Sequence, residues 1–258
     1  MIEAIASAGF GGIAPWRREV EGGDVAGIAR QIRDAGLAVS GYCRSPYIPA
    51  ATRQEFLENV AANKRAIDDA ASLGATSFVM VVGSLPKGSK DIEGARSQVR
   101  EAVAILLEHG RKAGVRIGLE PLHPVYAADR SCLTLLSEAL DWCDAIEGQV
   151  AEPWLGAVID VYHLWWDPNL ARDIARAGAA RRIFGFHVCD WLVPTADVLN
   201  DRGMMGDGVI DVRSIRRLVE DAGYSGAVEC EIFSANNWWK RPMTETLAAC
   251  RERFASAV

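Results

Sequence analysis

Acidic side chains and one histidine stand near the ends of four apolar segments between residues 115 and 233. Glu120 ends "VRIGLE", Asp160 ends "LGAVID", His187 lies in "RIFGFHVCD" and Glu231 lies in "VECEIF". Glutamate is almost never fully buried unless it is paired or binds a metal. Because the four residues occupy successive segments, we expect them to form one ring of ligands around a shared site.

Each of these residues also has a purely structural interpretation when it is taken alone. Glu120 could pair with an arginine, Asp160 could cap a turn, and His187 could bond to a backbone carbonyl in the core. Their occurrence on four successive segments favours a metal site instead. The ligand set is mostly oxygen, which suits Mn²⁺, Mg²⁺ or Co²⁺, with Zn²⁺ as an alternative. Glu229 shares strand parity with Glu231 but lies one layer deeper, so we expect it to be a buried structural partner.

Three further residues are candidates for contact with a substrate. His123 and His163 each lie three positions beyond a candidate ligand. Arg202 follows a long loop, and long loops at a catalytic face are usually functional. Its guanidinium could bind hydroxyl, keto or carboxylate oxygens, or it could pair at the surface with the aspartate before it.

Tryptophan is abundant near the same segment ends. The tryptophans expected there are Trp16, Trp165, Trp166, Trp191, Trp238 and Trp239. Aromatic rings pack against the C–H faces of sugars, and they are also enriched where two subunits meet. We therefore take Trp16 and Trp191 as candidate substrate contacts, while an interface with a second copy of the chain remains an alternative.

One unit of strand, loop and amphipathic helix repeats along the chain and would position these residues. The expected strands are 11–16, 37–43, 76–83, 115–120, 155–163, 182–190 and 226–233. The expected helices are 2–9, 24–36, 53–73, 92–114, 131–146, 170–178, 211–222 and 243–256. Alternating strands and helices predict a parallel sheet, and the number of units favours a (β/α)8 TIM barrel. No G-x-G-x-x-G follows a strand, which weakens a dinucleotide-binding fold.

The expected strands number seven, one fewer than a TIM barrel needs. The segment 2–9 reads as the helix that would follow a first strand. We therefore expect that the first strand of the barrel pattern precedes Met1, in a segment of roughly 15–20 residues.

Composition and charge limit the classes of protein that this chain could be. Its 258 residues, of which 24% are charged, suit one barrel domain spanning 1–258. A net charge of −6 argues against nucleic-acid binding, and no apolar run approaches the roughly 20 residues that span a bilayer. No secretion signal is visible, and six scattered cysteines are typical of reduced thiols in a cytoplasmic protein.

The ordered motifs resemble those of the sugar phosphate isomerase/epimerase family, which has a xylose-isomerase-like barrel. The matching motifs are "LEP" at Glu120, D-x-x-H at Asp160 and His163, H-x-x-D at His187, R-x-x-x-G-x-G-x-x-D from Arg202 to Asp211, and "EIF" at Glu231. The resemblance implies that Glu120, Asp160, His187 and Glu231 hold the metal and that His163 and Arg202 touch the substrate. Members include inosose isomerases, inosose dehydratases and ketose 3-epimerases.

Two departures narrow what the resemblance implies. Ketose 3-epimerases often carry a second glutamate six residues after the first, where this chain has Tyr126. Endonucleases of the same superfamily bind three metals through several extra histidines, whereas this chain has four histidines in all. Free-ketohexose epimerisation and DNA repair are therefore both disfavoured.

The function expected from these residues is that of a metal-dependent isomerase or epimerase of a keto-sugar, sugar phosphate or inosose. Glu120 and Glu231 would move the proton through a metal-stabilised enediolate. A dehydratase that uses His163 or His123 as the acid is the nearest alternative, and a non-catalytic sugar-binding barrel is a more distant one. No Gly-rich phosphate cradle is visible, which favours an uncharged keto-sugar or polyol.

Overall fold

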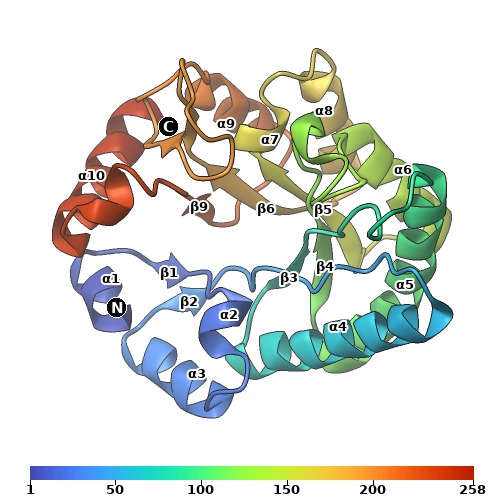
Figure 1. Cartoon of the computed structure of the whole chain (residues 1–258). Helices are drawn as coiled ribbons and strands as arrows, with labels where there is room; N and C mark the ends of the chain where they lie inside the picture. The colour runs from blue at the N-terminus through green and yellow to red at the C-terminus, as the bar shows by residue number, and fades with distance from the viewer.

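Parallel strands alternate with helices through most of the chain in the computed structural model, which describes all 258 residues. The parallel strands are β1 (Gly12–Ile13), β2 (Ala38–Val39), β3 (Ser77–Met80), β4 (Arg116–Leu119), β5 (Leu155–Asp160), β6 (Ile183–Val188) and β9 (Val228–Cys230). Figure 1 shows them curving around a common centre, with the helices forming an outer layer. The predicted α/β barrel with seven parallel strands is confirmed.

The helices close most of the outer surface of this sheet. They are α1 (Ile2–Ser7), α2 (Arg17–Val20), α3 (Val25–Asp34), α4 (Arg53–Leu73), α5 (Ile92–Ala113), α6 (Leu136–Glu147), α7 (Val161–Leu164), α8 (Leu170–Ala179), α9 (Val212–Asp221) and α10 (Met243–Ala257), with 3₁₀ turns at η1 (Pro124–Tyr126) and η2 (Trp238–Lys240). None of them combines the length and apolar character that crossing a bilayer requires.

Local sequence signals account for the boundaries of the two longest helices. Thr52 and Glu55 form a reciprocal capping box at the start of α4. Asp91 accepts a hydrogen bond from a backbone N–H in the first turn of α5. Both helices end at a glycine in the left-handed conformation, Gly74 and Gly114, which a side chain would disfavour.

The register of the central sheet brings the candidate ligands side by side. Strands β3, β4, β5, β6 and β9 pair in that order, and all of these pairs are parallel. Asp160 on β5 lies opposite His187 on β6, and His187 lies opposite Glu229 on β9. Glu120 follows β4 and donates its backbone N–H to the carbonyl of Met80 at the end of β3. The strand ends therefore meet at one level.

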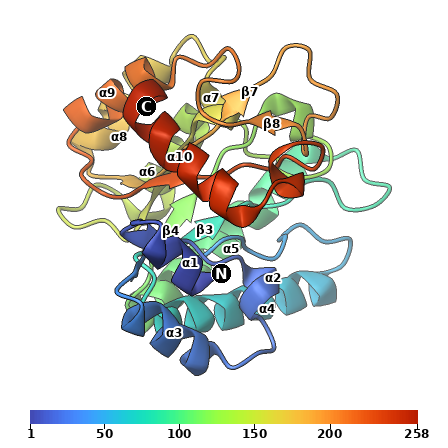
Figure 2. The same cartoon turned by 90° about the vertical axis from the view of Figure 1, so that its left-hand side faces the viewer.

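The ring of strands is not joined between β9 and β1. Strand β1 pairs with β2, and an isolated bridge from Tyr42 to Phe78 continues this pair to β3, whereas β9 pairs only with β6. The outer helices α1 and α10 approach each other across this side of the molecule (Figures 1 and 2). Arg251 on α10 donates a hydrogen bond of 2.8 Å to the carbonyl of Ala8, just after α1.

Two parts of the structure differ from the predicted elements. The strand expected over 155–163 stops at Asp160, because this side chain accepts a hydrogen bond from the Tyr162 N–H and caps the short helix α7. The expected long loop contains a hairpin, formed by the antiparallel strands β7 (Asp190–Trp191) and β8 (Arg202–Gly203). Short polar strands of this kind carry no periodic signal in the sequence.

A buried ion pair fixes the amino ends of the two central strands. Arg182 precedes β6, and its side chain is 2% exposed. It pairs with Glu147 at 2.7 Å and also donates to the carbonyls of Gly148 and Leu155. Glu147 in turn accepts the backbone N–H groups of Trp154 and Leu155, which begin β5. The strands that carry Asp160 and His187 are thus held in place from the end opposite the site.

We expect Arg182→Ala to lower the free energy of unfolding by about 3–5 kcal/mol, because it removes a buried side chain with its ion pair and its bonds to two carbonyls, and leaves Glu147 with Arg111 as its one charged partner. Denaturant unfolding followed by circular dichroism measures the change. Arg30→Ala is the control, since Arg30 pairs with Asp24 at 3.8 Å on the surface and should cost no more than about 1 kcal/mol. Equal losses in the two variants would contradict the role assigned to Arg182.

Candidate metal and substrate site

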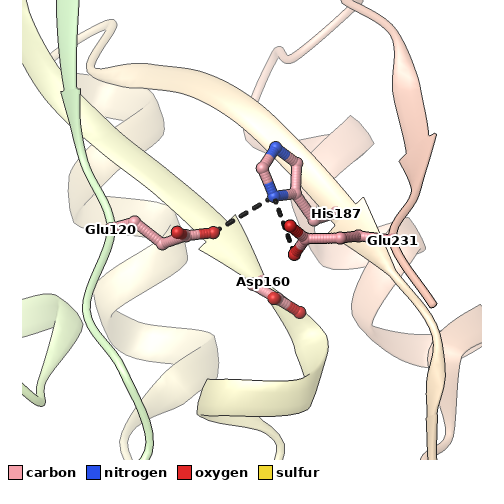
Figure 3. Close-up of side chains that lie close together, drawn as sticks. All are labelled: Glu120, Asp160, His187 and Glu231. Carbon is pink, nitrogen blue, oxygen red and sulfur yellow. Dashed lines mark ion pairs between the residues drawn. The ribbon is translucent and has the colours of Figure 1, made fainter. Parts of the chain in front are cut away.

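Four side chains from four neighbouring strands converge at the carboxyl end of the sheet. Glu120, Asp160, His187 and Glu231 each offer one atom, and these atoms all lie within 4.8 Å of one another. The first three residues are buried, and Glu231 is partly exposed. Figure 3 shows the carboxylates pointing toward one another and toward the imidazole. The sequence prediction that these residues share one level is therefore correct in position.

The contacts within this cluster are close but are not hydrogen bonds. His187 Nδ1 lies 3.1 Å from Glu120 Oε1 and 3.8 Å from Glu231 Oε2. Nevertheless, Glu120 Oε1 and both ring nitrogens of His187 lack a hydrogen-bond partner. Buried polar atoms are normally hydrogen-bonded, and unsatisfied ones need an explanation. Oxygen and nitrogen atoms that converge without hydrogen-bonding to one another are placed as the ligands of a cation would be. A set of three carboxylates and one imidazole suits a divalent metal.

The protonation of the cluster is strongly perturbed by burial and by its own charges. Burial raises the pKa of Asp160 to about 7, with Glu231 and Glu120 adding to the rise and Arg202 opposing it. Burial alone would lower the pKa of His187, but the surrounding glutamates raise it well above its usual value. Without a metal the cluster retains protons, which a cation would displace on binding.

Glu229 lies behind the cluster rather than in it. Its Oε2 is 3.4 Å from His187 Nε2, the ring nitrogen that faces away from Glu120. Burial raises the pKa of the Glu229 carboxyl, and His187 opposes this rise. The carboxylate is placed to orient the imidazole, as outer partners of metal-binding histidines usually do.

Arg202 is buried beside the cluster and contacts two of its carboxylates. Its Nη1 lies 3.3 Å from both Asp160 Oδ2 and Glu231 Oε2, and its Nη2 lies 3.3 Å from His163 Nε2. The guanidinium also lies over the Tyr162 ring, 4.2 Å from its centroid. The alternative of a surface arginine paired with the preceding aspartate is wrong, because the side chain is only 3% exposed.

His163 is also buried beside the cluster, on the short helix α7. Burial and the nearby Arg202 lower the pKa of its imidazole well below the usual value, so the ring is neutral. Its Nδ1 has no hydrogen-bond partner. Because Arg202 donates to Nε2, the neutral ring carries its proton on Nδ1, which can donate a hydrogen bond to a bound molecule.

The candidate aromatic residues separate into two groups. Trp16 lines the same pocket as the cluster and packs edge-on against Phe233, with ring centroids 5.1 Å apart. His123 and Trp191 do not line this pocket. They stack beside it, with ring centroids 5.0 Å apart, and Trp191 stacks on Tyr162 at 4.7 Å. Their link to the pocket is therefore indirect, because Trp191 packs on Tyr162 and the Tyr162 ring packs on Arg202, which lines the pocket.

The pocket includes several residues that sequence reasoning did not select. Its lining residues are Trp16, Arg44, Val81, Glu120, Leu122, Tyr126, Arg130, His163, Leu199, Arg202, Glu231 and Phe233. Arg44 directly follows the strand expected over 37–43, so its place at a carboxyl end was a usable signal. Arg130 lies in the loop after η1, and nothing in its local sequence marks it.

The family described as "Xylose isomerase-like TIM barrel" matches residues 2–253. The chain belongs to this xylose isomerase-like family. No curated protein matches the chain at a significant level. The family resemblance inferred from the ordered motifs is therefore confirmed at the level of the fold and the family.

Solved structures of the xylose isomerase-like barrel give the same result. Protein SMc04130 from Sinorhizobium meliloti 1021 is 49% identical, with a TM-score of 0.95 over 99% of this chain and 91% of that one. An IolI protein with a bound zinc atom is 17% identical, with a TM-score of 0.81 over 100% and 91% of the two chains. A D-allulose 3-epimerase from Methylomonas sp., in complex with D-allulose, is 19% identical, with a TM-score of 0.77 over 100% and 90%. The last two show the fold alone.

We expect this member of the family to bind one Mn²⁺, and Asp160→Asn to weaken that binding by more than about 100-fold. Loss of a ligand should exceed the 10- to 100-fold effect of losing an outer partner, which is the result expected for Glu229→Gln. Equilibrium dialysis with metal analysis gives both values. Asp173→Asn is the control, because Asp173 is a buried carboxylate of α8 that pairs with Arg172. Tight binding by Asp160→Asn would contradict the site.

Proposed function

We propose that this protein is a divalent-metal-dependent isomerase or epimerase that moves a proton next to the carbonyl of a keto-sugar, sugar phosphate or inosose, with Mn²⁺ as the metal. The observation that carries the proposal is the cluster itself, in which two glutamates flank an imidazole and an aspartate. Glu120 Oε1 and both ring nitrogens of His187 have no hydrogen-bond partner. Family membership supports the proposal, as do the names of similar structures, which include D-allulose 3-epimerase and 3-keto-D-glucoside 4-epimerase.

The two glutamates would supply the proton transfer. Glu120 comes from β4 and Glu231 from the segment after β9, so they approach the pocket from different sides. One carboxylate would remove a proton from the carbon next to the carbonyl, and the other would return it. Return to the neighbouring carbon gives an isomer, whereas return to the opposite face gives an epimer. A bound divalent metal would contribute Lewis-acid polarisation of the substrate carbonyl.

Arg202 and His163 would hold the oxygen atoms of the substrate beside these bases. Arg202 is fixed by Asp160 and Glu231, and its Nε has no hydrogen-bond partner. His163 is neutral and has a free ring nitrogen. Together they offer donors next to the place where negative charge develops on the substrate.

A dehydratase is the nearest alternative for the same site. Loss of water from the substrate needs an acid next to the departing hydroxyl group. The only histidine that lines the pocket is His163, and its pKa is lowered by burial and by Arg202. Such a group is a poor acid for this step, which is why we rank the dehydratase second.

The test is to follow solvent deuterium into the carbon skeleton of keto-sugars and inososes with the Mn²⁺-loaded protein. We expect Glu120→Gln and Glu231→Gln each to lower turnover by about 10²- to 10⁴-fold, the usual contribution of a general base. Metal content must be measured in the same samples, because each residue is also a proposed ligand. Exchange that persists in both variants at full metal occupancy would exclude the proton-transfer role.

Glu229→Gln separates the bases from the residue behind them. Because Glu229 contacts His187 rather than the pocket, we expect turnover per bound metal to stay within about tenfold of the wild type. If Glu229→Gln abolishes exchange while Glu231→Gln stays active, the roles assigned to the two glutamates are reversed.

A further inference from the structure

Two arginines that line the pocket have no negatively charged partner. No carboxylate oxygen lies within 4.0 Å of the guanidinium of Arg44 or Arg130, and neither guanidinium donates a hydrogen bond within the chain. Both arginines line the same pocket as Glu120 and Glu231. Each lies over a tyrosine ring instead, Arg44 at 4.6 Å from the Tyr47 centroid and Arg130 at 5.6 Å from the Tyr126 centroid. Such stacking orients a guanidinium and leaves its N–H donors free.

These two charges remain unmatched when the cluster binds its metal. The cluster has three carboxylates, whose three negative charges would be balanced by a divalent cation together with the buried Arg202. Glu229 stands behind His187 rather than in the pocket. Arg44 and Arg130 are then the arginines of the pocket that have no carboxylate within 4.0 Å, although the whole chain carries a net charge of −6.

The two arginines come from other segments than most of the metal cluster. Arg44 follows β2, whereas Asp160, His187 and Glu231 come from β5, β6 and the segment after β9. Arg130 stands in the loop after β4, ten residues beyond Glu120. A substrate held by the metal cluster at one end would reach the arginines with its other end. Guanidinium groups bind carboxylate and phosphate oxygens through paired hydrogen bonds.

We propose that the substrate carries an anionic group, a carboxylate or a phosphate, which Arg44 and Arg130 bind at the end away from the reacting carbonyl. This inference rests on the proposed isomerase or epimerase function and specifies its substrate class as keto-sugar acids or sugar phosphates. It departs from the sequence-based expectation of an uncharged keto-sugar or polyol. That expectation considered only Gly-rich phosphate cradles, and two arginines from separate loops need no such cradle.

The test compares three ligands that differ only at carbon 6, namely D-fructose, D-fructose 6-phosphate and D-fructuronate. Their dissociation constants are measured by calorimetry with the Mn²⁺-loaded protein at low ionic strength. We expect at least one of the charged ligands to bind tenfold or more tightly than D-fructose, and its rank against the other distinguishes phosphate from carboxylate. Arg44→Ala and Arg130→Ala should each weaken the charged ligand by about 10- to 100-fold, the scale of a hydrogen bond to a charged group, and leave D-fructose within twofold.

Matched variants make the result specific to the two side chains. Arg33→Ala removes an exposed arginine of α3 that has no carboxylate partner, and it should leave every dissociation constant unchanged. Arg44→Lys and Arg130→Lys keep the charge but lose the paired donors, so they should give intermediate binding of the charged ligand. Melting temperature and Mn²⁺ content confirm that each variant is folded and loaded.

The outcomes separate this inference from the function on which it rests. Equal binding of all three ligands, binding of none, or a charge preference that survives loss of both arginines would overturn the anionic substrate. In those cases metal binding and deuterium exchange could still support the isomerase or epimerase. Absence of metal binding by the four-residue cluster would instead overturn the proposed function.

Discussion

Repulsion between carboxylates in a buried space is the constraint around which this molecule is organised. Three carboxylates belong to the cluster, whose candidate ligand atoms all lie within 4.8 Å of one another. His187 of the cluster and the adjacent Arg202 are the cationic groups that pair with them. Burying like charges in this way is costly unless cations or protons compensate for them. The parallel register brings the carboxylates together, and it also places His187, which can compensate part of their charge, beside Asp160.

The position of Arg202 beside the cluster depends on a further buried carboxylate, that of Asp190. Asp190 accepts hydrogen bonds of 2.8–2.9 Å from the backbone N–H groups of Trp191, Gly206, Gly208 and Ile210. These bonds fold the return segment back onto the end of β6. Gly208 approaches so closely that a Cβ would collide with the carbonyl of Trp191, and Gly206 has φ of +88°. The aspartate of the H-x-x-D motif and the glycines of the G-x-G motif thus form one tight turn, which positions Arg202.

The sequence predicted the parts of the structure that depend on local signals. Terminal glycines marked the ends of the long helices, and apolar runs ending in a charge marked the strand ends that carry Glu120 and Asp160. The β7–β8 hairpin and the position of Arg130 were not predictable, because both depend on contacts between distant segments. The side-chain cap that Asp160 forms on α7 places His163 on a helical turn and not on a strand. Residue type alone could not show that Arg44 lacks an acidic partner.

The Arg182–Glu147 pair lies at the opposite end of the strands from the candidate site, and this separation affects how related proteins can diverge. The Arg182–Glu147 pair stabilises the amino ends of β5 and β6, while the groups that would select a substrate stand on loops at the opposite ends. Replacing an arginine in such a loop by a neutral residue would leave the Arg182–Glu147 pair intact. A few substitutions in the loops at the carboxyl ends of the strands can therefore change the preferred substrate during evolution. The barrel does not first have to become more stable.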